Sequence, residues 1–255
     1  MFTFFKRRRR GRLMRLSPPG AWLQILERNV PYYQRLPVED QRELVGLVQI
    51  FLAEKEFEGC GGLEITDEIR VTIAAQACVL LLHRETDLYP MLQTILVYPH
   101  TYVAAENFHN PDGTVSEGGE ARLGESWFRG PLVLSWDDVL QAAHDVRDGH
   151  NVVFHEFAHQ LDSETGSTDG APVLPKRSMY IAWARVLGGE YSALLEALEH
   201  HRQTVIDEYG ATNPAEFFAV VTECFFENAG SLKTRHPELY SQLVSFYKQD
   251  PAANS

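Results

Sequence analysis

The sequence predicts a mostly helical α+β domain with a small β-sheet. Long segments carry apolar residues at helical spacing, and only two short runs, rich in β-branched and aliphatic residues, are typical of strands. The chain of 255 residues is long enough to bury a full core, and neither an internal repeat nor a low-complexity linker divides it. We therefore expect a basic tail over residues 1–20, followed by one domain over residues 21–255.

The beginning of the chain is strongly basic. Residues 1–16 contain seven basic side chains and no acidic one, whereas the whole chain has a formal net charge of -12. We expect a solvated, disordered arm here, and the open alternative is contact between this arm and an anionic membrane surface or nucleic acid. The acidic character of the remaining residues argues against nucleic acid as a partner of the folded body.

Cysteine content and hydropathy indicate a cytoplasmic protein. The three cysteines form no C-x-x-C pair, so neither a disulfide framework nor a cysteine-rich zinc site is expected. The basic start is followed by Pro-Pro-Gly at residues 18–20 rather than by an apolar segment, so no signal peptide is predicted. The longest apolar run, at residues 77–82, is too short to span a bilayer.

The first half of the chain contains the predicted strands. Apolar residues at helical spacing predict helices over residues 37–55 and 66–83. A β-branched run at residues 94–98 predicts a strand, and residues 130–134 predict a second one, either an edge strand that pairs with a peptide or an interior strand. Between them, residues 105–126 are polar and glycine-rich with a turn signal at 110–113, which is typical of a hairpin beside a cleft or of a solvated loop.

The second half is predicted to be helical. Ser135 and Asp138 form a capping-box-like pattern, Asn151 is a good N-cap, and Asn213 precedes Pro214 at the first helical position. The helices are expected at residues 135–146, 151–162, 179–207, 213–230 and 237–248.

Residues 155–159 read His-Glu-Phe-Ala-His on one of these helices. Residues four apart lie on one helical face, so His155 and His159 can present their imidazoles to a single metal ion. Glu156 lies close enough to touch a metal-bound water without binding the metal itself. This is the H-E-x-x-H arrangement of zinc metallopeptidases. The alternative is an ordinary amphipathic helix that carries two surface histidines.

Catalytic zinc needs a third protein ligand. The pattern that continues with Gly and a third His is absent, because this chain has Asp162 and Thr165 at those positions. A carboxylate from a later helix is the remaining common solution, and Glu216 is the best candidate. Its alternative role is a capping box with Asn213, in which the carboxylate bonds only its own helix terminus. Two other carboxylates on the same helix are rival ligands: Glu223 and Glu227.

Several motifs in one order resemble the Mlc titration factor A family. They cover about residues 37–251, and the basic start has no part in the resemblance. The matching segments are residues 95–99 (ILVYP), 125–136 (ESWFRGPLVLSW), 155–162 (HEFAHQLD), 213–219 (NPAEFFA) and 246–251 (FYKQDP).

The resemblance implies a zincin-like metallopeptidase domain and a zinc-dependent peptidase with aminopeptidase activity on peptides. One zinc ion would be held by His155, His159 and Glu216, the ligand set of gluzincins. Glu156 is expected to act as the general base, and the resemblance implies that Tyr209 assists catalysis.

The resemblance also implies a protein partner, a transcriptional repressor of sugar uptake. The alternative function is therefore a regulatory protein that sequesters this repressor, although the intact Glu156 favours an enzyme. Position 220 is valine, so no carboxylate is available there to orient a ligating imidazole. Asp162 or Glu223 is expected to take that role instead.

Overall fold

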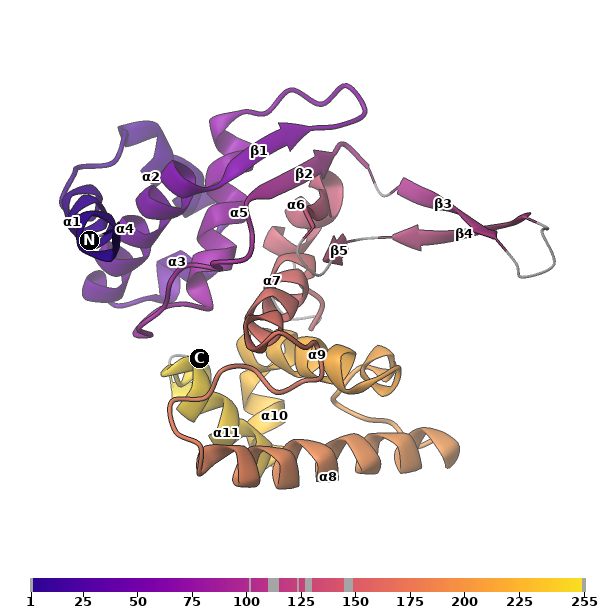
Figure 1. Ribbon diagram of the computed structural model, residues 1–255. Helices are drawn as coiled ribbons and strands as arrows, with labels where there is room; N and C mark the ends of the chain where they lie inside the picture. The colour runs from indigo at the N-terminus through magenta and orange to yellow at the C-terminus, as the bar shows by residue number, and fades with distance from the viewer. Residues whose placement is uncertain are drawn as a thin grey trace.

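The computed structural model describes residues 2–100, 102–109, 115–122, 124–126, 130–144 and 149–253, with the backbone alone for residues 2, 3, 102–126 and 144. Helices make up most of these residues (Figure 1). The α-helices are α1 (Phe2–Leu13), α2 (Gly20–Asn29), α3 (Pro31–Arg35), α4 (Val38–Glu54), α5 (Asp67–Val79), α6 (Trp136–His144), α7 (Val152–Asp162), α8 (Met179–Glu199), α9 (Pro214–Glu227), α10 (Ala229–Arg235) and α11 (Pro237–Tyr247). Short 3-10 helices are η1 (Ser163–Thr165), η2 (Glu208–Ala211) and η3 (Pro251–Ala253).

The main sheet has the strand order β1-β2-β6-β5. Its strands are β1 (Glu56–Gly59), β2 (Thr94–Tyr98), β5 (Gly124–Ser126) and β6 (Leu132–Ser135). β1, β2 and β6 are parallel, and β5 runs antiparallel to β6. Both predicted strands are confirmed as β2 and β6. Since β6 lies between β2 and β5 and all four of its residues are buried, it is an interior strand and not a free edge.

A separate hairpin follows β2. It consists of β3 (Tyr102–His109) and β4 (Val115–Arg122), which pair antiparallel with Ala105 opposite Gly119. Residues 105–109 and 115–122 therefore belong to a hairpin, as one of the predictions for this segment has it, whereas the predicted turn at 110–113 lies outside the described residues. In Figure 1 the hairpin projects away from the helices.

The helices expected from periodicity are present as α4, α5, α6, α7, α8, α9 and α11, with three corrections. α5 ends at Val79 rather than at 83, and His83 has a positive φ of 61°. α8 ends at Glu199 rather than at 207, because His201 has a positive φ of 51°, which cannot continue a right-handed helix. α9 ends at Glu227, and α10 begins at Ala229 after a break at Asn228. None of the described helices is long and apolar enough to cross a membrane.

α7 lies at the centre of the hydrophobic core. Phe157 is completely buried, and its ring meets Tyr89 at 4.8 Å and Phe51 at 5.8 Å between ring centroids. On its other side α7 packs against α9, where Phe154 meets Phe226 at 5.2 Å. Figure 1 shows α7 between the sheet with its helices and the C-terminal helices. The two halves of the chain therefore meet at the helix that carries the two candidate histidines.

The disordered arm expected over residues 1–20 is replaced by helix α1 across residues 2–13. Arg10 makes a bidentate ion pair with Glu54, with nitrogen–oxygen distances of 2.9 and 2.6 Å, and a further contact with Asp87 at 2.7 Å. The Arg10 and Glu54 side chains are only 13% and 14% exposed. The expectation was wrong because these acidic partners lie on distant segments that charge counting along the chain does not locate.

Substituting Arg10 with alanine should therefore release α1 from the body. Loss of charge-assisted hydrogen bonds of this kind typically costs about 1.5–3 kcal/mol, so amide hydrogen exchange in residues 2–13 should accelerate roughly 10- to 100-fold. Arg7→Ala is the matched control, because Arg7 is exposed and has no ion pair among the described residues. Equal acceleration in both variants would contradict the proposed docking of α1 through Arg10.

Candidate metal centre

The first turn of α7 is held in place by its N-cap. The side-chain oxygen of Asn151 accepts a hydrogen bond from the Phe154 N–H at 2.9 Å. Its side-chain nitrogen donates to Gln76 of α5 at 3.1 Å and to Glu227 of α9 at 3.0 Å. One capping residue thus connects three helices, and it lies one turn before His155.

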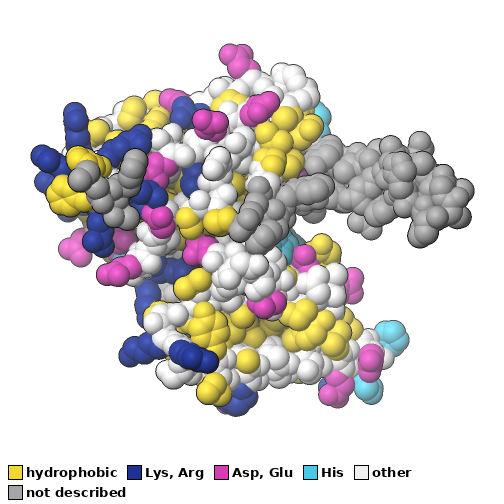
Figure 2. All heavy atoms as spheres, in the orientation of Figure 1, with side chains coloured by type: hydrophobic (Ala, Val, Ile, Leu, Met, Phe, Trp, Pro, Cys, Tyr) yellow, Lys and Arg dark blue, Asp and Glu magenta, His cyan; other side chains and the backbone are white. Residues whose placement is uncertain are grey.

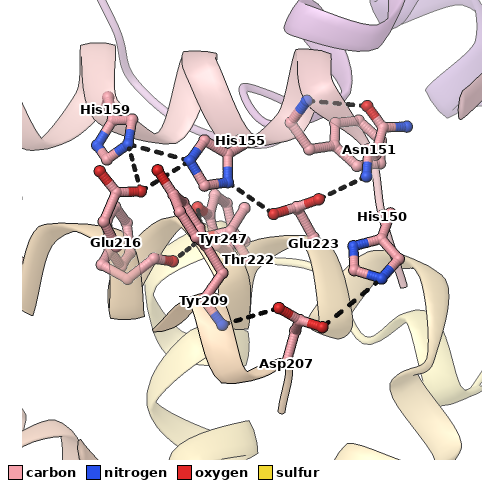
Figure 3. A network of polar contacts seen from close by, with 12 residues as sticks. His150, Asn151, His155, His159, Asp207, Tyr209, Glu216, Thr222, Glu223 and Tyr247 are labelled. Carbon is pink, nitrogen blue, oxygen red and sulfur yellow. Dashed lines mark hydrogen bonds and ion pairs between the residues drawn. The ribbon is translucent and has the colours of Figure 1, made fainter. Parts of the chain in front are cut away.

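His155 and His159 project from the same face of α7 towards α9 (Figure 3). Their Nε2 atoms are 3.2 Å apart, and the side chains are 15% and 11% exposed. The spacing of four residues therefore places both imidazoles together, at the edge of the core and still reachable from solvent.

Glu216 reaches the same point from the first turn of α9. Its backbone N–H is capped by the side chain of Asn213 at 3.0 Å, with Pro214 at the first helical position. Its Oε2 lies 2.9 Å from Nε2 of His155 and 3.3 Å from Nε2 of His159. The Glu216 carboxylate therefore faces the histidines, and its helix terminus is capped by Asn213 instead.

The start of α9 is positioned by a tight contact with the loop that follows α7. Gly170 has a φ of +78°, and a Cβ there would lie 2.4 Å from the carbonyl oxygen of Pro214. Its N–H donates to Asp162 at 2.8 Å, and its carbonyl accepts from Trp183 at 2.9 Å. Only glycine fits this approach, so Gly170 sets how closely Glu216 can come to α7.

His155, His159 and Glu216 together fit a zinc ion. Each offers one ligand atom, and these atoms lie within 4.8 Å of one another. The distances between them are 3.2, 2.9 and 3.3 Å. Zinc binds nitrogen at about 2.0–2.1 Å, so two ligands of a tetrahedral ion lie about 3.3 Å apart. Two imidazoles and one carboxylate are also a ligand set of catalytic zinc.

Glu223, one of the rival ligands, has a different place. Its Oε1 lies 2.7 Å from Nδ1 of His155, and its Oε2 accepts the backbone N–H of Asn151 at 2.5 Å. With a proton on Nδ1, the lone pair of Nε2 points towards Glu216 and His159, as metal binding requires. Glu223 is therefore suited to orient His155.

The other residues considered for these roles lie elsewhere. Asp162 accepts the N–H of Gly170 through Oδ2, and its buried Oδ1 has no hydrogen-bond partner among the described atoms. Glu227 accepts from Asn151 and lies outside the three-residue group. Of the two candidates for orienting an imidazole, only Glu223 contacts one directly.

The carboxylates around the histidines favour positive charge. Burial lowers the pKa of His155, but hydrogen bonds with Glu216 and Glu223 outweigh burial and raise it to about 10. Burial raises the pKa of Glu216, yet hydrogen bonds with the two histidines prevail and lower it to about 2. A site with these properties stabilises a cation between its groups, whether that cation is a proton or a metal ion.

Glu156 is buried beside this group. Its side chain is 4% exposed, and its Oε2 has no hydrogen-bond partner among the described atoms. Burial raises the pKa of Glu156 to about 7. A buried carboxylate with an unused oxygen and a pKa near neutrality is suited to exchange protons with a reactant.

Tyr209 lies at the open side of the group, on η2. It is 54% exposed, and its ring centroid is 5.8 Å from that of His155. Its N–H donates to Asp207 at 2.8 Å, and Figure 3 shows its ring extending towards His155 and Glu216. The hydroxyl is therefore placed at the entrance to the group.

A second set of possible ligands, Asp40, Glu43 and His83, lies near the surface. Each ring nitrogen of His83 faces a different carboxylate, Nε2 towards Asp40 at 3.4 Å and Nδ1 towards Glu43 at 3.2 Å. This set offers one imidazole and two carboxylates, whereas the α7 group offers two imidazoles and one carboxylate, which is a ligand set of catalytic zinc.

Comparisons with known proteins match most of the chain. The family profile described as "Glucose-regulated metallo-peptidase M90" matches residues 4–248. The chain belongs to this M90 family. It is therefore a metallopeptidase, as the H-E-x-x-H motif predicts. The match begins inside the basic segment, which the motif resemblance had left out.

Individual relatives are similar to the chain over most of its length. The chain is 44% identical over 248 residues to "Uncharacterized protein slr2042" of Synechocystis sp., with 96% of this chain and 90% of the relative covered. It is 33% identical to Mlc titration factor A of Serratia proteamaculans over 88% of this chain and 86% of that protein. The corresponding protein of Klebsiella pneumoniae is 32% identical over 90% and 86%. The predicted resemblance to Mlc titration factor A is thereby confirmed.

Sequence reasoning missed the network behind the site. Gln76 is 3% exposed in the middle of α5 and accepts from Asn151, so α5 also supports the start of α7. The sequence signal for this network was a glutamine between two alanines, Ala75 and Ala77, within an apolar helix, because a polar side chain there needs a hydrogen-bond partner.

Two glutamine variants should distinguish direct zinc binding by Glu216 from orientation of His155 by Glu223. Glu223→Gln removes the negative charge behind His155 and should weaken zinc affinity about 10- to 100-fold. Glu216→Gln replaces a ligand and should weaken it more. The measurement is zinc titration against a fluorescent chelator.

Glu190→Gln is the control, since Glu190 makes the same kind of contact, 2.7 Å to Nδ1, with His236 outside the site. Zinc affinity that is unchanged in Glu223→Gln would show that Glu223 does not support the metal centre.

Proposed function

We propose that the chain is a zinc-dependent peptidase of the gluzincin type that hydrolyses peptide bonds and has aminopeptidase activity. The observation that carries the proposal is the convergence of His155, His159 and Glu216 on one point, with the buried carboxylate of Glu156 beside it. A structural cluster of surface histidines would need neither the convergence nor the unused carboxylate oxygen.

In this proposal His155, His159 and Glu216 hold one zinc ion. When bound, zinc supplies Lewis-acid activation of water and of the peptide carbonyl. Glu156 accepts a proton from the attacking water and passes it to the leaving amine. Its burial supports both steps, because a pKa near 7 allows the carboxyl group to take up and release a proton at neutral pH.

Tyr209 is proposed to donate a hydrogen bond to the oxyanion that develops on the carbonyl. Its position at the entrance, with the ring 5.8 Å from that of His155, supports this role. Loss of such a donor typically lowers kcat by about 10²–10³-fold. Glu223 is proposed to keep His155 in the tautomer that leaves Nε2 free.

The proposed preference for free amino termini rests on the motif resemblance. We also propose that residues 21–255 act as one peptidase domain, on which α1 docks, and that the protein works in the cytoplasm. The three free cysteines, two of which are buried, support the last point.

The central test uses Glu156→Gln, which keeps the size of the side chain and removes the base. Peptide cleavage should fall at least about 100-fold, while zinc content stays at one ion per chain. The substrates are a peptide with a free amino terminus and the same peptide acetylated.

Preferential cleavage of the free peptide supports an aminopeptidase, whereas equal cleavage of both contradicts that preference. Unchanged turnover by Glu156→Gln would contradict the mechanism, and zinc-free protein with full activity would contradict the zinc assignment.

We propose as a second function that the chain binds a transcriptional repressor of sugar uptake. The Serratia and Klebsiella relatives are named Mlc titration factor A, which supports this proposal. Mlc of Serratia proteamaculans serves as the probe in an equilibrium binding measurement. Binding at micromolar concentration that is equal for the wild-type chain and Glu156→Gln would establish a role separate from catalysis. No binding by either protein would contradict the second function.

A further inference from the structure

The basic helix α1 has two different faces. Residues three or four apart share a face of a helix, so Lys6, Arg9, Arg10 and Leu13 lie together. Lys6 pairs with Asp87 at 2.8 Å, Arg9 donates to the carbonyl of Ala53 at 3.1 Å, and Arg10 pairs with Glu54 and Asp87. Leu13 packs against the core. This face holds the helix to the body.

The opposite face is exposed and has no partner among the described residues. Phe4 and Phe5 are 66% and 60% exposed, and their rings lie edge to face at 6.0 Å between centroids. Four exposed basic residues lie on this side and, with the two phenyl rings, make up the outer face of α1: Arg7, Arg8 and Arg12 in the helix and Arg15 just beyond its end. None of the four forms an ion pair with any described residue, although the chain as a whole has a formal net charge of -12. Figure 2 shows dark blue side chains gathered at the end of the molecule where Figure 1 places α1.

We propose that the outer face of α1 binds an anionic phospholipid surface. The four guanidinium groups complement phosphate groups of the lipid headgroups, and each basic residue near such a surface strengthens binding about five-fold. The two phenyl rings enter the boundary between headgroups and acyl chains, where apolar side chains leave water. The arginine side chains can lie along that boundary and keep their charges among the phosphates.

The apolar side chains favour lipid over nucleic acid as the occupant. Leu16, just beyond α1, is 48% exposed, so three large apolar side chains accompany the arginines, whereas the side chain of Met14 packs against Gly46 of α4. Aliphatic side chains gain from contact with acyl chains, whereas a nucleic acid backbone offers them nothing comparable.

Docking of α1 to the body gives the proposed contact a consequence for the orientation of the body. Because Arg10 is paired with two acidic side chains of other segments, a bound membrane would hold the whole body in one orientation. α1 lies at the opposite end of Figure 1 from the β3–β4 hairpin, so the hairpin would point away from the lipid. Lipid binding by the outer face of α1 requires neither zinc nor peptidase activity.

The test is sedimentation of the full chain with vesicles of phosphatidylcholine alone or with about one third phosphatidylglycerol. A quadruple variant replaces the four exposed arginines by glutamine: Arg7, Arg8, Arg12 and Arg15. The matched control makes the same change of charge at exposed arginines elsewhere: Arg177, Arg185, Arg202 and Arg235. The Phe4→Ala, Phe5→Ala double variant tests the rings, and circular dichroism checks that every variant remains folded.

We expect binding to the anionic vesicles only, weakened at least about 100-fold in the quadruple variant, several-fold in the phenylalanine variant and hardly at all in the control. Raising NaCl from about 0.1 to about 0.5 M should weaken it further. Equal loss in the control, equal binding to uncharged vesicles, or no binding to either vesicle would overturn the proposal. Binding of a short DNA duplex through the same arginines without vesicle binding would overturn it in favour of nucleic acid.

Discussion

The candidate metal centre depends on one chain of contacts, from the backbone N–H of Asn151 through the carboxylate of Glu223 to Nδ1 of His155. It joins the beginning of α7 to the middle of α9 and determines which ring nitrogen faces Glu216. Asn151 also caps α7 through its side chain, so the same residue stabilises the helix and places the carboxylate that orients the histidine. The orientation of His155 therefore depends on the packing of α7 against α9, because Glu223 of α9 contacts both Asn151 and His155.

The electrostatics of the centre follow from how these helices are packed. Three carboxyl groups, those of Glu156, Glu216 and Glu223, surround two imidazoles at the edge of an apolar core. Placing several carboxylates close together in a buried position costs free energy unless a cation lies between them. Burial raises the pKa of Glu156, whereas the histidines lower that of Glu216. Neighbouring carboxylates therefore acquire different chemical roles from their surroundings alone.

Acidic side chains have different roles at α1 and at the histidines of α7. Acidic side chains on the body hold Arg10 on the inner face of α1, and this contact leaves the arginines of the outer face without partners. In the centre, acidic side chains converge on the histidines of α7 instead. The net charge of the whole chain predicts neither the contacts of α1 nor those of the α7 histidines, because both depend on which side chains the fold brings together.

Local patterns by themselves determined most of the helices, the caps Asn151 and Asn213, and the placement of His155 and His159 on one face, because capping and helical periodicity act within a few residues. Tertiary structure decided among Glu216, Glu223 and Glu227, which share one helix: the packing of α7 on α9 brings Glu216 to Nε2 and Glu223 to Nδ1 of His155. It also decided the pairing of β1 with β2 and the folding of α1, whose partners Glu54 and Asp87 are 44 and 77 residues from Arg10. Such contacts are set by the packing of the whole chain, so no pattern within a single segment specifies them.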